Sequence, residues 1–375
     1  MAVTLKSKYG RQIPEQIAAM ITAVYPAFLA KSFLRDALKG YDALELMPRG
    51  VHIAAALKTH LPADFPQAVN ILLQSMSLQA KQTDSGGLAS FLFLPHAMFV
   101  AQHGLGHFAE SMQAQHAITQ RFTAEFSMRP FLVQHQHATL EQLTLWASDP
   151  SHHVRRLVSE CSRPRLPWAA RLRPFQRDPQ PVLALLELLK DDPSLYVRRS
   201  VANNLNDIGK DHLQLLVDVA ARWMKNATAE REWIVRHALR SAIKRGDRGA
   251  LAVLGFAAKT TLTIGYENLS PLSSITPRRA KIGGSVVITF DLTNHAKRQA
   301  DAIVDFAVHF VKANGRANAK VFKLKTIRLG AGQTQRLSKK ISLAEMTTRQ
   351  LYAGKHQIDI IINGVVTPLG AFVLN

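Results

Sequence analysis

The feature that most constrains the fold is a motif that occurs twice in the middle of the sequence. Asp149-Pro-Ser-His-His-Val-Arg-Arg aligns with Asp192-Pro-Ser-Leu-Tyr-Val-Arg-Arg, 43 residues further along the chain. A weaker third copy, Glu232 to His237, places Val235 another 38 residues after Val197. Such periods are typical of stacked helix pairs of the HEAT kind. The sequence therefore predicts an α-solenoid, in which each Asp caps a helix with Pro at its first position.

The apolar pattern changes from helical to strand-like near residues 259 to 264. Apolar residues recur at helical spacing from Gln12 to about residue 258, and beyond that they alternate with other residues. The alternating positions are Val286, Ile288, Phe290 and Leu292, then Val304, Phe306, Val308 and Phe310, then Phe322 and Leu324, and finally Ile358, Ile360 and Ile362. Turn signals such as Asn363-Gly364, a favoured two-residue hairpin turn, separate these runs. We expect a multidomain protein, all-α over residues 1–261 and an all-β sandwich over residues 262–375.

The chain carries 47 Lys and Arg against 27 Asp and Glu, a formal net charge of +20. This balance favours a polyanionic partner, nucleic acid first and an anionic membrane surface second. The predicted β part is the more densely charged, with 16 basic and 6 acidic residues. Lys323 and Lys325 are its candidate DNA contacts, although lysines that protect a sheet edge produce the same pattern.

The composition also limits the cellular setting and the metal chemistry. No run approaches 18 uninterrupted apolar residues, and the first residues do not resemble a signal peptide. The single cysteine, Cys161, excludes intrachain disulfides and multi-cysteine zinc or iron–sulfur sites. We expect a soluble protein of the reducing cytoplasm that needs no cofactor.

The first repeat has two chemically different helix faces. With Val154 facing inward and 100° per residue, Leu157, Val158 and Cys161 fall within about 60° of it and form a core stripe. Arg156 and Glu160 fall at about 200° and 240°, on a face that we predict to be exposed. The equivalent positions are Arg199 and Asn203 in the second repeat, and His237 and Ser241 in the third. Only the first repeat therefore presents a carboxylate at this phase.

The two arginines of each repeat have different predicted roles. Arg155 and Arg198 follow the motif Asp by six residues, as in the Asp–Arg ladder that joins neighbouring HEAT repeats. Arg156 and Arg199, on the outer phase, are better placed for phosphate. Glu160 is the one acid among seven arginines between residues 155 and 177, so its pKa should be lowered. A plain surface ion pair of Glu160 with Arg156 and Arg163, worth roughly 0 to 1 kcal/mol, is the alternative.

A longer string, from His153 to Ala169 (HVRRLVSECSRPRLPWA), resembles the signature of the AlkC branch of bacterial alkylpurine DNA glycosylases. One departure within this string is Cys161, where a small residue such as Gly is expected. Residues 192–205 also match the pattern of the family. The resemblance implies a HEAT-like array, followed in some members by an immunoglobulin-like domain. The implied reaction is hydrolysis of the N-glycosidic bond of a cationic base in duplex DNA, such as 3-methyladenine or possibly methylcytosine. Such enzymes act without flipping the base, and we expect a monomer at the nucleoid.

The resemblance also implies which residues act. The expected catalytic set is Glu160, Trp168, Asp207 and Glu125, and the expected DNA contacts are Arg156, Arg163, Arg165, Arg199 and Lys210 with Lys323 and Lys325. Because an alkylated base already bears positive charge, it departs without a strong general acid, and one anion beside the oxocarbenium-like sugar would suffice. Glu160 would supply it and orient water, and Trp168 would present an aromatic face. The residues alone favour a buried core position for Trp168, since Trp is commonly buried.

Other signals carry less weight. His103-Gly-Leu-Gly-His107 has zinc-compatible spacing, but it lacks the glutamate of HExxH and its glycines weaken a helix. Cys161 falls on the buried stripe without an evident base, which disfavours a nucleophile. A HEAT scaffold without enzymatic activity is the main rival, since repeats and positive charge would suffice for it. A nuclease is a third possibility, but there is no carboxylate cluster for two metals.

Overall fold

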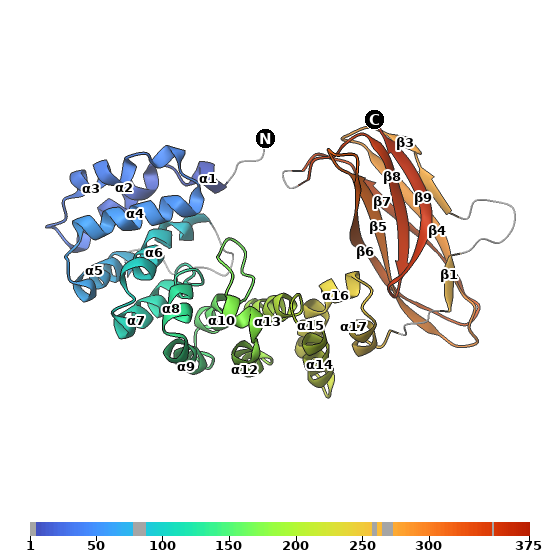
Figure 1. The fold of residues 1–375 in the computed structure, drawn as a ribbon, viewed down its shortest axis with the longest axis horizontal. Helices are drawn as coiled ribbons and strands as arrows, with labels where there is room; N and C mark the ends of the chain where they lie inside the picture. The colour runs from blue at the N-terminus through green and yellow to red at the C-terminus, as the bar shows by residue number, and fades with distance from the viewer. Residues whose placement is uncertain (1–4, 78–87, 257–260, 265–272, 347–348) are drawn as a thin grey trace. The chain divides into compact units, whose positions relative to one another are not determined.

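The computed structural model describes residues 5–77, 88–256, 261–264, 273–346 and 349–375. The longer helices of the first part are α2 (Gln12–Val24), α3 (Ala30–Leu38), α4 (Leu46–His60), α5 (Phe65–Ser77), α6 (Leu94–His103), α7 (Phe108–Thr119), α9 (Gln136–Trp146), α10 (His152–Cys161), α12 (Gln180–Leu189), α13 (Leu195–Ile208), α14 (Leu213–Met224) and α15 (Ala229–Ala238). Shorter helices are α1 (Leu5–Lys8), α8 (Arg129–Gln134), α11 (Arg173–Arg177), α16 (Arg240–Lys244) and α17 (Arg248–Val253), and the 3-10 helices are η1 (Tyr41–Ala43) and η2 (Leu88–Phe93). Strands follow from β1 (Leu262–Ile264), as Figure 1 shows.

The predicted change from helices to strands is confirmed. α17 ends at Val253, and β1 begins at Leu262. The predicted boundary, residues 259 to 264, lies partly in residues 257–260, which are outside the described residues. The compact units divide the chain differently. One comprises residues 1–212 and 227–238, and the other comprises 213–226 and 239–375. The domain border at residue 261 stays a prediction.

The three predicted repeats form one stack of helices. α13 packs against α10 on one side and α15 on the other (Figure 1). The aligned valines Val154, Val197 and Val235 are all completely buried, because each occupies the inward position of its helix. The predicted α-solenoid is confirmed.

The predicted Asp–Arg ladder joins the first two repeats. Arg155 Nε and Nη2 donate to the two carboxylate oxygens of Asp192 at 2.6 and 3.2 Å. The cap prediction is wrong, because α10 and α13 begin three residues after their Asp. Asp149 and Asp192 instead accept from the backbone N–H groups of Ser151 and Ser194, and so shape the turn before each helix.

The second part is a sandwich of two sheets. In one sheet β4 (Ser285–Asn294) pairs with β7 (Thr334–Ser342) along one edge and with β1 and β2 (Ser273–Thr276) along the other. The other sheet has the order β3 (Arg279–Ala280), β9 (Val365–Leu374), β8 (Gly354–Ile362), β5 (Ala300–Val311) and β6 (Ala317–Leu329). Only the β3–β9 pair among these is parallel.

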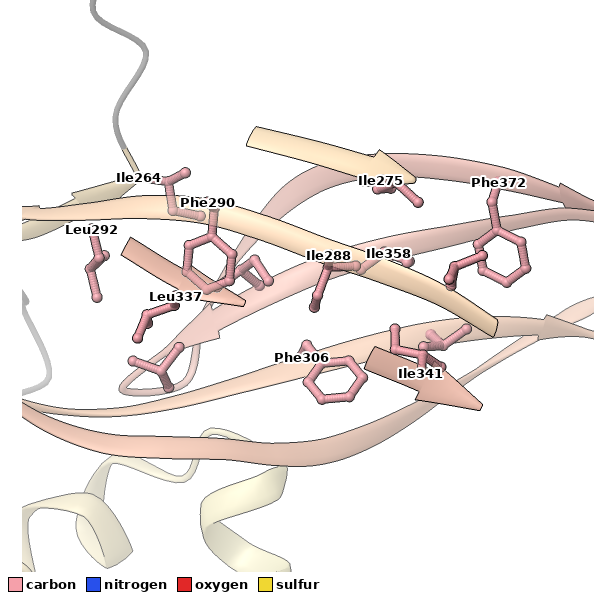
Figure 2. Close-up of a cluster of buried hydrophobic side chains, with 14 of the residues drawn as sticks. Ile264, Ile275, Ile288, Phe290, Leu292, Phe306, Leu337, Ile341, Ile358 and Phe372 are labelled. Atoms are coloured by element: carbon pink, nitrogen blue, oxygen red, sulfur yellow. The ribbon is translucent and has the colours of Figure 1, made fainter. Parts of the chain in front are cut away.

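The alternating apolar residues fill the space between the sheets. Ile288, Phe290 and Leu292 of β4 lie in one core with Phe306 of β5 and Ile358 of β8 (Figure 2). These positions were predicted from period-two alternation, which places them on one face of each strand.

The predicted hairpin turn is also present. Asn363 and Gly364 connect β8 to β9 with φ values of 47° and 80°, as a type I′ turn requires. In the same unit, Leu251 of α17 and Phe256 pack against Ile303 of β5.

Candidate active site

The polar face of α10 is buried, contrary to the prediction. Glu160 is 5% exposed, Arg163 is 8% exposed, and the side chain of Arg156 is 16% exposed. The phase of the helix was predicted correctly, since Val154, Leu157, Val158 and Cys161 are completely buried on the other side. In an isolated helix pair this face of α10 would be exposed to solvent. In the structure α13 and the segments around Glu125 and Trp168 lie against it.

Six charged side chains of alternating sign form a continuous chain of ion pairs. Arg156 links Glu125 (2.5 Å) to Glu160 (3.5 Å), and Arg163 links Glu160 (2.6 Å) to Asp207 (2.7 Å). Lys210 pairs with the other oxygen of Asp207 at 2.7 Å. The structure thus brings together Glu125, Glu160 and Asp207, which are separated by 35 and 47 residues in sequence. We name this set the ion-pair chain.

Glu160 is held as an anion within the ion-pair chain. Its Oε1 accepts from Arg163, and its Oε2 accepts from the Ser200 hydroxyl at 2.6 Å. Burial alone would raise the pKa of Glu160, but the charges of Arg156 and Arg163 and the Ser200 hydrogen bond outweigh it, so the pKa is lowered. The direction predicted from the arginine-rich segment is confirmed.

Arg156 and Arg163 are committed to carboxylates. Burial opposes their positive charge, yet Glu125 and Glu160 around Arg156, and Glu160 and Asp207 around Arg163, raise the pKa of both guanidinium groups. The ring of Tyr196 lies 5.2 Å from the Arg156 guanidinium carbon, a cation–π contact. Each arginine therefore orients two carboxylates, and a further phosphate contact by either stays a prediction.

A cavity of about 330 Å³ opens beside the ion-pair chain. Its charged lining is Glu125, Arg156, Glu160 and Arg163, and its other lining residues are Ser90, Phe91, Phe122, Thr123, Phe126, Leu166, Pro167, Trp168 and Tyr196. Trp168 is 63% exposed, so it is not a core aromatic. Asp207 joins the site through Arg163. An ionised carboxylate next to aromatic rings is suited to stabilising a cation.

Several site residues were missed by the sequence reasoning. Ser200 and Asn204 occupy the positions equivalent to Leu157 and Cys161 of the first repeat, so polar residues stand where the stripe should be apolar. Both are buried, and Asn204 donates to the Ser159 carbonyl oxygen at 2.8 Å. This break in the core pattern was a readable signal. Thr123, which donates to Glu125 at 2.9 Å, had no such signal.

The other predicted DNA contacts differ in their surroundings. Arg199 is exposed on α13, whereas Arg165 makes a two-point pair with Asp211 that lowers the pKa of this aspartate to about 2. In the β unit Lys323 and Lys325 are exposed on β6, an edge strand of its sheet, and Lys323 lies across from Asp305. The edge position agrees with both interpretations of these lysines.

The two histidines with zinc-compatible spacing belong to different elements. His103 ends α6 and its ring contacts Phe99, while His107 precedes α7 and stacks on Phe65. Within the described ranges no group of three or more His, Cys, Asp or Glu is arranged to hold a metal ion. Burial raises the pKa of the Cys161 thiol, which disfavours a thiolate there. The same ranges contain no helix with the length and apolar run that crossing a membrane requires.

Comparison with known proteins connects this geometry to a family. The uncharacterized protein YhaZ of Bacillus subtilis is 36% identical over 367 residues, covering 96% of this chain and 97% of YhaZ. The structure of the Pseudomonas fluorescens alkylpurine DNA glycosylase AlkC, bound to DNA containing an abasic site analog, superimposes with a TM-score of 0.89. It is 38% identical, and each chain is covered completely. The chain belongs to the AlkC family of alkylpurine DNA glycosylases.

The β unit agrees with this assignment. Residues 272–375 match the family described as "Uncharacterised protein YhaZ, C-terminal Ig-like domain". The fold predicted from the sequence, a HEAT-like array followed by an immunoglobulin-like sandwich, is therefore confirmed for this AlkC family member. The resemblance noted in the string from His153 to Ala169 identified the family correctly.

Proposed function

We propose that this protein is a DNA glycosylase that hydrolyses the N-glycosidic bond of small cationic alkylated bases, such as 3-methyladenine, in duplex DNA. The observation that carries the proposal is the ionised, buried Glu160 at a cavity that also presents Trp168. AlkC, the similar glycosylase, was solved with DNA that contains an abasic site analog, the product state of such a reaction. The protein would act as a monomer at the nucleoid in the cytoplasm.

The chemistry needs an anion more than an acid. An alkylated base carries positive charge and leaves readily, while the sugar develops oxocarbenium character. Glu160 would stabilise that cation and orient the attacking water, because it is ionised and fixed before the reaction begins. Arg156 and Arg163 would keep its carboxylate in place. Glu125 and Asp207 would complete the set by orienting these two arginines from outside.

Trp168 would contact the sugar or the base at the mouth of the cavity. An exposed indole ring offers its negative face to an electron-poor partner. Because 63% of Trp168 is exposed, its ring can meet a nucleotide that remains stacked in the duplex. The proposal therefore includes excision without base flipping.

Exposed cations would hold the DNA backbone around this site. Arg199 and Lys210 lie on and just after α13, in the unit that contains Glu160, and both are exposed. Arg165 and the lysines of β6, Lys323 and Lys325, are further candidates. Each phosphate contact should contribute to the salt dependence of binding.

The test is base release from methylated duplex DNA by Glu160→Gln, which removes the charge and keeps the shape. We expect release of 3-methyladenine to fall by roughly 10²- to 10³-fold, with binding to an abasic-site duplex retained. Glu141→Gln, at an exposed position of α9, is the matched control and should release base like the parent.

Two results would contradict the proposal. If the parent protein binds DNA but releases no base, the chain is a nucleic-acid-binding scaffold. If Glu160→Gln releases base at the parent rate, Glu160 has no part in catalysis.

A further inference from the structure

One buried arginine outside the ion-pair chain connects several parts of the site. Arg129, the first residue of α8, is 6% exposed. Its Nη1 donates to the carbonyl oxygens of Cys161 (3.1 Å) and Arg163 (2.9 Å), and its Nη2 donates to that of Ala170. Burial lowers the pKa of Arg129 to about 10, so the group remains charged at neutral pH.

The three carbonyl oxygens lie at the end of α10 and in the loop that follows it. Residues 162–172 run from the end of α10 to the start of α11 and carry both Arg163 and Trp168. The loop is also closed by the Leu172 N–H, which donates to the Pro164 carbonyl oxygen at 3.2 Å. At the tip of this loop Trp168 has φ 63°, a conformation that side chains other than Gly rarely adopt. Such a conformation persists only where the surroundings fix it.

We propose that Arg129 is a positioning residue, which closes the loop of residues 162–172 and thereby fixes Trp168 relative to Glu160. The planar guanidinium has several donors at fixed angles, so it can hold three carbonyl oxygens at once. Two of these oxygens lie one and three residues after Glu160, and the third lies two residues after Trp168. Arg129 therefore helps to set the distance between the carboxylate and the ring. This inference rests on the proposed function, in which both groups contact the nucleotide.

The chain provides a matched control in Arg49 of α4. It is also 6% exposed, and its hydrogen bonds likewise go to backbone carbonyl oxygens, those of Leu44, Lys6, Tyr9 and Asp42. These residues lie in and between the N-terminal helices, and none of them lines the cavity beside Glu160. Arg49→Lys should therefore cost similar stability without disturbing Trp168.

The experiment compares Arg129→Lys with Arg49→Lys in the full chain. A lysine keeps the charge but cannot hold three carbonyl oxygens in the same geometry. We expect Arg129→Lys to lower the single-turnover rate of 3-methyladenine release at saturating enzyme by about 10- to 100-fold, the size expected for misplacement near 1 Å. Arg49→Lys should stay within about twofold. In a Trp168→Ala background, Arg129→Lys should lower release no further.

A spectroscopic measurement does not depend on activity. The part of the fluorescence that disappears in Trp168→Phe comes from Trp168 alone. Quenching of this part by acrylamide reports the surroundings of the ring, and it should change in Arg129→Lys but not in Arg49→Lys. The proposal would be overturned if Arg129→Lys and Arg49→Lys lowered the rate of base release equally. It would also be overturned if the rate in the double variant Arg129→Lys with Trp168→Ala fell by the product of the two single effects. Unchanged quenching in Arg129→Lys would also overturn it. If this variant does not fold, Arg129→Gln takes its place in the same comparison.

The outcomes separate this inference from the proposed function. Base release by the parent protein and its loss in Glu160→Gln test the glycosylase. The quenching of Trp168 and the comparison of the two lysine variants test Arg129.

Discussion

Arg163 Nη1 donates to Glu160 Oε1 at 2.6 Å, and both residues are less than 10% exposed. The same guanidinium contacts Asp207 at 2.7 Å, so a single buried cation serves two buried carboxylates. A buried ion pair is costly to form and much more costly to break, since removal of one partner leaves an uncompensated charge. The arrangement therefore favours a fixed position for the proposed catalytic anion over maximal stability.

Arg163→Met should destabilise the protein strongly. It leaves Glu160 and Asp207 next to each other without the cation between them, and loss of one partner from a buried pair costs about 3 to 5 kcal/mol. Adding Asp207→Asn should recover part of this loss, because one of the two carboxylates is then neutral. Urea unfolding measures the free energy of unfolding of the single and the double variant. Arg165→Met, which breaks a more exposed pair with Asp211, is the comparison, and an equal loss there would contradict the prediction.

Ser200→Ala should move the acid limb of the pH–rate profile to higher pH. The hydroxyl of Ser200 donates to Glu160 and is one of the causes that lower the pKa of this carboxyl. Without it the pKa rises, so Glu160 becomes protonated at a higher pH and release is lost earlier on acidification. Single-turnover release across the acidic range measures the shift. Ser148→Ala, at an exposed position, should leave the profile in place, and a shift to lower pH in Ser200→Ala would refute the prediction.

Trp168→Gly should separate activity from stability. The side chain is 63% exposed and its backbone has φ 63°, which Gly adopts without strain, so the free energy of unfolding should change by no more than about 1 kcal/mol. Base release should nevertheless fall, because the aromatic face is gone. Trp146→Gly, at a position 7% exposed, should lose about 3 to 5 kcal/mol instead. Similar stability losses in the two variants would show that Trp168 supports the fold.

His96 should make the helical part sensitive to mild acid. The ring is completely buried in α6, and burial lowers the pKa of His96 to about 3. In the unfolded chain the pKa of this histidine is near 6.5, so the unfolded chain binds the proton first as the pH falls. This contribution to the free energy of unfolding is therefore fully present above pH 6.5 and decreases below it.

The loss should be about 1.4 kcal/mol per pH unit between about pH 6.5 and 3. Urea unfolding at pH 7 and pH 5 measures it. His96→Gln, which cannot titrate, should show a smaller difference between the two pH values than the parent. His137→Gln, at a side chain 88% exposed, should behave like the parent, and a parent-like response from His96→Gln would exclude this histidine as the cause.

The sequence by itself determined the local features of this protein. The repeat at residues 149 and 192 predicted the stacked helices, and period-two alternation predicted the strands and the inward residues of the sandwich. The phase of α10 followed from helix geometry alone, since Val154 and Cys161 needed only their spacing to be assigned to the core. These features depend on neighbours in sequence, for which the geometry of helices and strands is fixed.

Only the tertiary structure decided the character of the site. Helix phase identified the face of Arg156 and Glu160 but not what covers it. Ser200 and Asp207 come from the next repeat, and Glu125 comes from the segment between α7 and α8. Their approach turned a predicted surface ion pair into a buried chain of alternating charges. The fixed position of Trp168 likewise depends on Arg129, which lies 39 residues away in sequence. Burial and charge balance arise from contacts between distant segments, and these contacts exist only once the repeats have packed together.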